Sequence, residues 1–528
     1  MRRFILVLAI LGLTAAALPA GASARFDLGV AAGEVTSSSA RVWAHSTRSG
    51  RVAILLDFDR GFLPPVAAKT ARASRSADNT VQTTLTGLRP NRTYFYRFIM
   101  GRSRSKVGTF KTAPRPTQNA TIRFAFSGDA DAQPARGQRR PFWNNFQVYR
   151  RMQLERNVFN VNMGDVIYSD TEVGATLSGG VFQPAARTAL TVPAKWAKYR
   201  QNLALANLAN LRGSSTVYNH WDDHEFVNDF SKAENGNAVY RAGVKAFRDY
   251  MPVTYSSANG IYRSFRWGRN LEVFFLDERS FRSAKASAGD RCDDSRGNPD
   301  LGPTAPQGSR NVFAAIYPPL SQPPKPGCVE TIRDPSRTML GSRQFARFTS
   351  ALQRSTATFK VIMNEVPMHQ WYALPYDRWE GYEAERRRLM DFVSGNQIKN
   401  VVFLTTDAHG NLINTIKFST LSEQGPPVDT GIFDFVTGPV ATKSYHKEVA
   451  DVLGSEGNAS LFRSVVLKGN PPTGVAMRCA ADDVFSYSEV TVSANTLTVQ
   501  PKDINGSPVR EDPSIGGAQC GPFTVNRQ

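Results

Sequence analysis

The sequence has few of the residues that build soft-metal sites. It contains only six histidines and four cysteines in 528 residues, and no two cysteines stand in a CxxC pair. Cysteine-based zinc sites use closely spaced pairs, so we expect none here. The chain also lacks zinc-finger spacing and any RNP-like motif, so we expect no specific nucleic-acid partner.

Long apolar runs are absent after the first two dozen residues, so we expect no transmembrane segment in the mature protein. Arg2 and Arg3 precede an apolar stretch over residues 4–18, and Ala22-Ser23-Ala24 suits a signal peptidase. We predict a signal peptide over residues 1–24 and a secreted or extracytoplasmic protein. The arginine pair makes the twin-arginine route our hypothesis for export. An uncleaved anchor is the alternative, but the run is shorter than the roughly 20 residues such a helix needs.

The four cysteines fit an oxidising compartment. Of the three possible pairings, neighbour pairing closes the shorter loops and is favoured; it joins Cys292 to Cys328 and Cys479 to Cys520.

Acidic residues are also in the minority, with 45 against 64 Lys and Arg and a formal net charge of +19. A field of this sign attracts anionic partners, such as phosphate esters, wall polymers or lipid head groups. A solvated basic surface with no specific partner is the alternative. Nothing in the sequence indicates the oligomeric state.

Two patterns divide the remaining chain. Residues 25–116 contain short β-rich runs separated by turns, and a tyrosine in segment 88–96 suits a sandwich corner, so this part resembles a fibronectin type III domain. Residues 117–528 alternate β-rich runs with stretches at helical spacing, which is typical of an α/β domain. The stretches predicted as helices are 142–156, 196–211, 238–251 and 382–393. A long insertion over residues 283–336 is expected to lie over a functional surface or to be mobile.

Five apolar runs in the α/β part end in polar, mostly acidic residues. The runs and their polar ends are 122–126 with Ser127 to Asp131, 158–163 with Gly164 to Tyr168, 216–220 with Trp221 to Glu225, 359–363 with Asn364-Glu365, and 401–406 with Asp407 to His409. Ligands of such sheets bind beyond the carboxyl ends of the strands, so we expect these side chains to converge at one sheet edge.

So many carboxylates at one place would repel one another unless cations relieved the repulsion. Carboxylate, amide and phenolate oxygens favour hard cations. Each motif alone has an ordinary explanation: Gly164-Asp165 is a common turn, and Tyr168 suits a hydrophobic core. The prediction of a metal centre depends on all five ends occurring together, with three of the six histidines among them.

These motifs resemble the PhoD-like alkaline phosphatases and phosphodiesterases, a branch of the calcineurin-like metallophosphoesterases. The resemblance lies in residues 164–168, 221–225, 276–282 and 407–409 and extends over nearly the whole mature chain. It implies a fibronectin-III-like β-sandwich followed by a four-layer αββα metallophosphoesterase domain with a C-terminal β extension.

The resemblance also implies roles for single residues. Asp165 would bridge two metals, Tyr168 would bind a ferric ion, and His224 would meet the phosphate. The full set of implied metal ligands is Asp129, Asp165, Tyr168, Asp223, Asn364, Asp407 and His409. Two or more metal ions are implied, Fe³⁺ with Ca²⁺, and other divalent metals are alternatives. The family pattern places a cysteine where this chain has Asp129, which is a harder ligand.

The implied function is hydrolysis of phosphate esters by a water or hydroxide held between the metals, with Arg279 as a phosphate clamp. Arg282 is a second candidate clamp, and a surface ion pair is the alternative for both arginines. Two alternative functions stay open at this point: a phospholipase D that acts on lipid head groups, and a non-catalytic wall-binding protein.

Overall fold

The computed structural model describes residues 24–170, 188–419 and 428–528. Except for Ala24, the predicted signal peptide lies outside the described residues. Among the helices that the structure describes, none combines the length and apolarity needed to cross a bilayer.

The N-terminal part is a β-sandwich, as predicted. Tyr94 is buried, and its hydroxyl accepts a hydrogen bond of 2.8 Å from the backbone N–H of Arg89, which confirms the tyrosine corner. One sheet holds β1 (Val30–Gly33), β2 (Ser39–His45) and β5 (Thr80–Thr86). The other holds β3 (Gly50–Asp57), β4 (Ala67–Ala73), β6 (Thr93–Met100), β7 (Ser103–Arg104) and β8 (Gly108–Lys111).

The first sandwich sheet continues into the sheet of the α/β part, because β1 pairs with the parallel strand β11. The combined nine-stranded sheet has the order β21-β20-β19-β9-β10-β11-β1-β2-β5. Its further strands are β9 (Ile122–Ser127), β10 (Phe159–Met163), β11 (Thr216–His220), β19 (Ser486–Val492), β20 (Thr496–Asp503) and β21 (Phe523–Asn526). The predicted boundary near residue 116 falls in the loop between β8 and β9. The division into separate units there stays a prediction, since the two parts share a sheet.

A second sheet has seven strands in the order β12-β13-β14-β15-β17-β16-β18. These are β12 (Arg263–Trp267), β13 (Leu271–Phe275), β14 (Phe359–Asn364), β15 (Val401–Thr405), β16 (Asn411–Lys417), β17 (Asp429–Val436) and β18 (Cys479–Ala481). Side chains of both sheets form one buried core, in which Phe159 of β10 packs 4.7 Å from the ring of Trp267 in β12. Burial of this apolar surface holds the sheets face to face.

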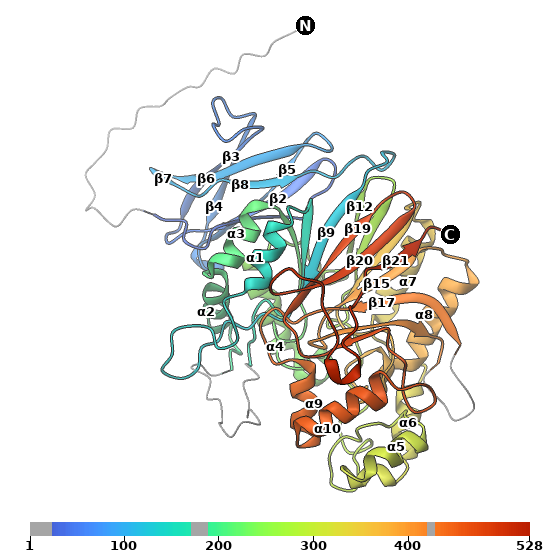
Figure 1. The fold of residues 1–528 in the computed structure, drawn as a ribbon. Helices are drawn as coiled ribbons and strands as arrows, with labels where there is room; N and C mark the ends of the chain where they lie inside the picture. The colour runs from blue at the N-terminus through green and yellow to red at the C-terminus, as the bar shows by residue number, and fades with distance from the viewer. Residues whose placement is uncertain (1–23, 171–187, 420–427) are drawn as a thin grey trace.

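Helices cover the outer faces of both sheets and complete four layers (Figure 1). The nine-stranded sheet is covered by α1 (Gln147–Leu154), α2 (Val192–Leu203), α3 (Ala206–Ser214) and α4 (Lys232–Tyr250). The seven-stranded sheet is covered by α7 (Gly341–Arg354) and α8 (Glu383–Gly395). One predicted helix, over residues 196–211, is two helices, because Leu205 has extended backbone with ψ of 124°. Short helical turns are η1 (Arg75–Ala77), η2 (Pro318–Ser321), η3 (Trp379–Tyr382), η4 (Arg463–Leu467) and η5 (Pro513–Ile515).

Four more helices gather at one end of the molecule, at the bottom of Figure 1. They are α5 (Gln307–Ala314) and α6 (Pro326–Arg333) from the insertion, and α9 (Tyr445–Leu453) and α10 (Glu456–Phe462) from the C-terminal part. The insertion therefore has its own helices.

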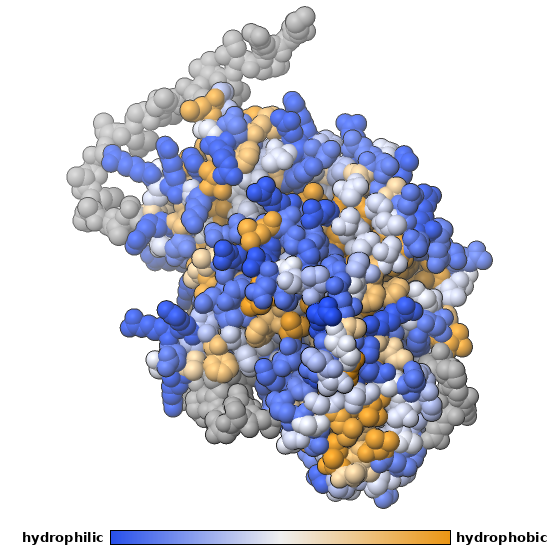
Figure 2. All heavy atoms as spheres, viewed as in Figure 1, coloured by the Kyte–Doolittle hydropathy of each residue, from blue (hydrophilic) through white to orange (hydrophobic). Residues whose placement is uncertain are grey.

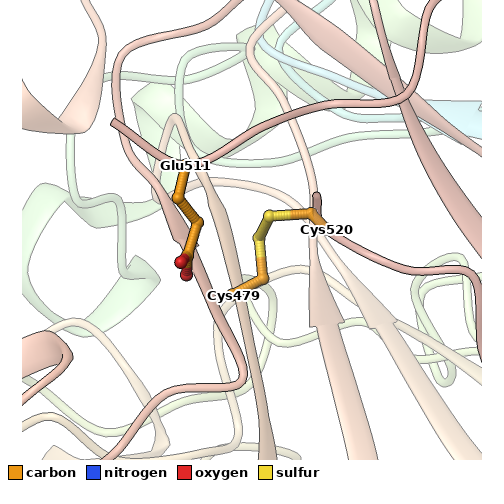
Figure 3. A group of neighbouring side chains, drawn as sticks. All are labelled: Cys479, Glu511 and Cys520. Carbon is orange, nitrogen blue, oxygen red and sulfur yellow. A yellow bond between two sulfur atoms is a disulfide. The ribbon is translucent and has the colours of Figure 1, made fainter. Parts of the chain in front are cut away.

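Both disulfides join neighbouring cysteines, as predicted: Cys292 to Cys328 and Cys479 to Cys520. Glu511 lies beside the second disulfide (Figure 3). Its carboxylate already accepts hydrogen bonds from Lys468 and from the backbone of Ala480, and the sulfurs are bonded to each other. This group therefore stabilises the C-terminal strands and is not a metal site.

Candidate metal centre

The five predicted strands are present, but they belong to two sheets. β9, β10 and β11 lie in the nine-stranded sheet, and β14 and β15 lie in the seven-stranded sheet. The acidic ends therefore meet from two facing sheets rather than along one edge, which corrects the expectation drawn from the sequence. Face-to-face packing of the sheets brings their carboxyl ends to the same end of the core.

The structure places seven residues of these ends in three overlapping groups. In each group the possible ligand atoms lie within 4.8 Å of one another. The groups are Asp129, Asp165 and His409; Asp165, Asp223 and His224; and Asp222, Asp223 and Asp407. Because Asp165 and Asp223 are each shared by two groups, the arrangement is one continuous cluster. Tyr168 adjoins it, with its hydroxyl 3.1 Å from Nε2 of His409.

The backbone at four of these positions is in an uncommon conformation. Asp129, Asp165, Asp407 and His409 have φ values of 65°, 49°, 69° and 49°. Non-glycine residues rarely adopt positive φ, and such conformations concentrate at functional sites. Gly164 is needed for close packing, since a Cβ there would lie 2.5 Å from Cβ of Asp222.

Burial dominates the electrostatics of the cluster. It raises the pKa of Asp129 to about 6 and the pKa of Asp165 and Asp407 well above their usual value. Burial also raises the pKa of Asp222 to about 8, against the opposing charge of Arg279. Buried carboxylates are costly to ionise, and a cation removes that cost.

One oxygen of the cluster fits a cation directly. Asp129 is fully buried, and its Oδ2 has no hydrogen-bond partner among the described residues. The atom lies opposite Gly438, where a Cβ would come within 2.5 Å of it. An unpaired buried carboxylate oxygen is expensive, so its presence beside Asp165 and His409 matches the donor set of a metal ion.

Each histidine of the cluster is held by a carboxylate. Nδ1 of His224 lies 2.6 Å from Asp170, and Nδ1 of His409 lies 2.6 Å from Glu448 in α9. Such contacts fix the orientation of the ring. Burial alone would lower the pKa of His224, but Asp223, Asp165 and Asp170 outweigh it and raise that pKa well above its usual value.

Arg279 and Arg282 are completely buried, so the surface ion pair considered for both is wrong. The guanidinium of Arg279 bonds to Asp222, to Asp377 at 2.7 Å and to Asp407 at 2.9 Å. Arg282 bonds to Asp377 as well. Because the N–H groups of Arg279 donate to three carboxylates, its positive charge balances buried negative charge within the protein. Its role as a phosphate clamp stays a prediction.

Asn364 is the one predicted ligand that the contacts of the described residues do not join to the cluster. Its side chain bonds to the indole of Trp379 and to the backbone of Val366. Conversely, sequence reasoning missed Asp170, Glu448 and Asp377. Asp170 stands two residues after Tyr168 and could have been suspected, whereas nothing local marks the other two.

Two family profiles match the chain. The family described as "PhoD-like phosphatase" matches residues 135–497, and "PhoD-like phosphatase, N-terminal domain" matches residues 13–114. The chain belongs to the PhoD-like phosphatase family.

Individual relatives agree with membership of the PhoD-like family. Alkaline phosphatase D of Bacillus subtilis (strain 168) is 28% identical in an alignment of 433 positions, and the match covers 75% of this chain and 66% of that protein. The solved structure of PhoD has a TM-score of 0.71 and 22% identity, over 97% of this chain and 90% of the other. A purple acid phosphatase from yellow lupin (Lupinus luteus) seeds has a TM-score of 0.55 and 13% identity, over 94% and 74% of the two chains. At these identities the two structures support the fold.

Proposed function

We propose that the chain is an extracytoplasmic, metal-dependent phosphoesterase that hydrolyses phosphate esters as an alkaline phosphatase or phosphodiesterase. The observation that carries the proposal is the cluster of buried carboxylates with the unpaired Oδ2 of Asp129, in a chain of the PhoD-like family. The relative named an alkaline phosphatase favours this function over the phospholipase D and over a non-catalytic protein.

The geometry supports an assignment of residues to two cations. Asp129, Asp165, Tyr168 and His409 would hold one, and we propose a ferric ion there because a phenolate suits it. Asp165 and Asp223, with Asp407 and Asn364 as further candidates, would hold a second cation, for which Ca²⁺ is proposed. When bound, such cations supply the positive charge that polarises a phosphoryl group and activates water.

The chain's own residues supply the remaining functions. Asp170 holds Nδ1 of His224, and the carboxylates around this ring raise its pKa. Its other ring nitrogen is left to donate to a phosphoryl oxygen or to the departing alkoxide, which is the role of a general acid. Arg279 keeps Asp222 and Asp407 in place and offsets part of their charge.

The location is proposed on separate grounds. Two disulfides are consistent with an oxidising compartment. Export by the twin-arginine route predicts that Arg2→Lys with Arg3→Lys stops secretion of the folded protein. Unchanged secretion of that variant would contradict this route.

The activity is tested with mature protein stripped by a chelator and then reloaded with Fe³⁺ and Ca²⁺, separately and together. Hydrolysis of p-nitrophenyl phosphate and bis-p-nitrophenyl phosphate is expected only after reloading, and Asp165→Asn should abolish it. Asp131→Asn is the matched control, because Asp131 is equally buried and belongs to none of the three ligand groups. Full activity of Asp165→Asn, or of stripped protein, would overturn the proposal.

A further inference from the structure

A cavity of about 760 Å³ adjoins the carboxylate cluster. One wall is polar and contains Asp165, Asp223, His224, Asp407 and His409. The rest forms what we call the apolar chamber, built mainly from the insertion and from α9 and α10. Its lining includes Leu301, Ala305, Phe313, Val449, Phe462 and Val466.

The described basic side chains that line the cavity are each paired with a carboxylate. Among the described residues, four lysine and arginine side chains line the cavity, and each lies within 3 Å of a carboxylate. The pairs are Lys285 with Asp229, Arg310 with Asp300, Arg378 with Glu380, and Lys443 with Asp451. A second anionic group of a substrate would therefore meet no uncommitted cation there. This argues against a polyanionic occupant, despite the overall charge of +19.

The chamber is also held in shape by the contacts of the insertion. Arg310 bonds to Asp300 at 2.7 Å and to the backbone of Gly302 at 2.8 Å, and the hydroxyl of Tyr376 donates to the backbone of Asp300 at 2.7 Å. The disulfide from Cys292 to Cys328 ties the two sides of the insertion together. Preformed apolar walls bind apolar groups without the cost of ordering them first.

Apolar residues continue outward from the chamber. Val312 of α5, Val452 of α9 and Leu461 of α10 are 44%, 43% and 38% exposed. Figure 2 shows apolar side chains gathered at this end of the molecule. A group longer than the chamber would thus still meet apolar surface where it emerges.

We propose that the apolar chamber binds an uncharged, apolar alcohol group of the substrate while the phosphoryl group lies at the carboxylate cluster. The preferred substrates are then phosphate esters of apolar alcohols rather than of sugars or of polyanionic polymers. This inference rests on the proposed function, since it assumes that a phosphoryl group binds at the cluster.

The test uses alkylphosphonates, which carry one organic group on a bond that is not hydrolysed. Binding of methyl-, butyl- and hexylphosphonate to the metal-loaded protein is measured by calorimetry. Each methylene that becomes buried should tighten binding by up to roughly fourfold. We expect hexylphosphonate to bind at least 50-fold more tightly than methylphosphonate. Phenylphosphonate in parallel shows whether an aromatic alcohol serves as well as an aliphatic one.

Two comparisons make the test specific. Ala305→Trp should narrow the chamber and weaken the dependence on chain length, while binding of methylphosphonate is retained and shows that the variant is folded. Leu154→Trp, at an exposed position of α1 outside the cavity lining, should change neither the dependence on chain length nor the binding of methylphosphonate. A ligand with a terminal charge, 6-phosphonohexanoate, should bind more weakly than hexylphosphonate.

Equal binding of methyl- and hexylphosphonate, or tighter binding of 6-phosphonohexanoate, would overturn the proposal. Hydrolysis of p-nitrophenyl phosphate is measured on the same preparation. If the protein is active but its phosphonate binding does not depend on alkyl chain length, the proposed function stands and only the proposed role of the apolar chamber is refuted. Absence of both activity and phosphonate binding refutes the proposed function.

Discussion

Replacing Asp129 by asparagine separates two effects of this carboxylate: the stability that the folded protein loses by burying its charge, and the stability that it gains when the carboxylate binds a metal ion. Burial raises the pKa of Asp129 from 3.8 to about 6, so the ionised carboxylate destabilises the metal-free protein. Each pKa unit corresponds to roughly 1.4 kcal/mol, which makes the cost about 3 kcal/mol at pH 8. Below about pH 4 the carboxyl of Asp129 is protonated in the folded and the unfolded protein, and the folded state carries no penalty. As the pH rises through about 6 the buried group ionises, and the folded state loses this stability.

We therefore expect Asp129→Asn to raise the melting temperature of chelator-treated protein at pH 8 by a few degrees and to leave it nearly unchanged at pH 4. The amide keeps the size of the side chain, and the side chains of Asp129 and Asp165 have oxygen atoms within 4.8 Å of each other. With metal added, the order reverses, because the variant lacks one charged ligand and gains less from the cation.

The assay is thermal unfolding at both pH values, with and without Ca²⁺ or Fe³⁺. Asp131→Asn is the control: burial raises the pKa of Asp131 to about 6 as well, but this residue is outside the ligand groups. Asp131→Asn should raise the melting temperature of the metal-free protein at pH 8 by the same amount. Added metal should raise its melting temperature as much as it does in the unaltered protein. A lower melting temperature of metal-free Asp129→Asn at pH 8, or a full metal response, would refute the reasoning.

Three further outcomes are expected. Glu448→Gln should lower metal affinity by roughly 10- to 100-fold, measured by metal titration, because it loosens the ring of His409; unchanged affinity would show that this contact is incidental. Asp170→Asn should lower the pKa of His224 and move the alkaline limb of the pH–rate profile to lower pH, and an unmoved limb would argue against this histidine as proton donor. Serine in place of both cysteines of the insertion should cost roughly 4 kcal/mol of loop-closure stabilisation. It should weaken binding of hexylphosphonate far more than binding of methylphosphonate, and equal losses would contradict a chamber shaped by the insertion.

Local patterns of the sequence were sufficient to predict the strands that deliver the cluster. Each of the five is a short apolar run that stops at a polar turn, and both properties are local. That the strands divide between two sheets is decided by packing over the whole core, which no local pattern records. The break between α2 and α3 was missed for a related reason, since residues 196–211 keep their apolar spacing through the extended Leu205.

The residues that hold the cluster in place were harder to predict than the cluster itself. Glu448 reaches His409 because α9 packs at the end of the sheets, some 40 positions further along the chain. Arg279 was predicted to face phosphate, and the structure adds an ion pair with Asp377, which lies in an irregular loop about 100 residues later. Such long-range contacts depend on loop paths that composition does not specify.

The sheet shared by the two parts predicts what happens when the N-terminal sandwich is removed by truncation. Strand β1 lies against β11, the strand that leads into Asp222, Asp223 and His224. Trp43 of β2 donates a 2.8 Å hydrogen bond to the backbone of Asp249, and Arg263 pairs with Glu34 at 2.8 Å. Removing the sandwich would leave β11 as an unpaired edge strand and would remove these contacts with α4 and β12. The sandwich therefore stabilises the sheet that carries part of the carboxylate cluster. A fragment that starts near residue 117 should fold poorly and tend to aggregate.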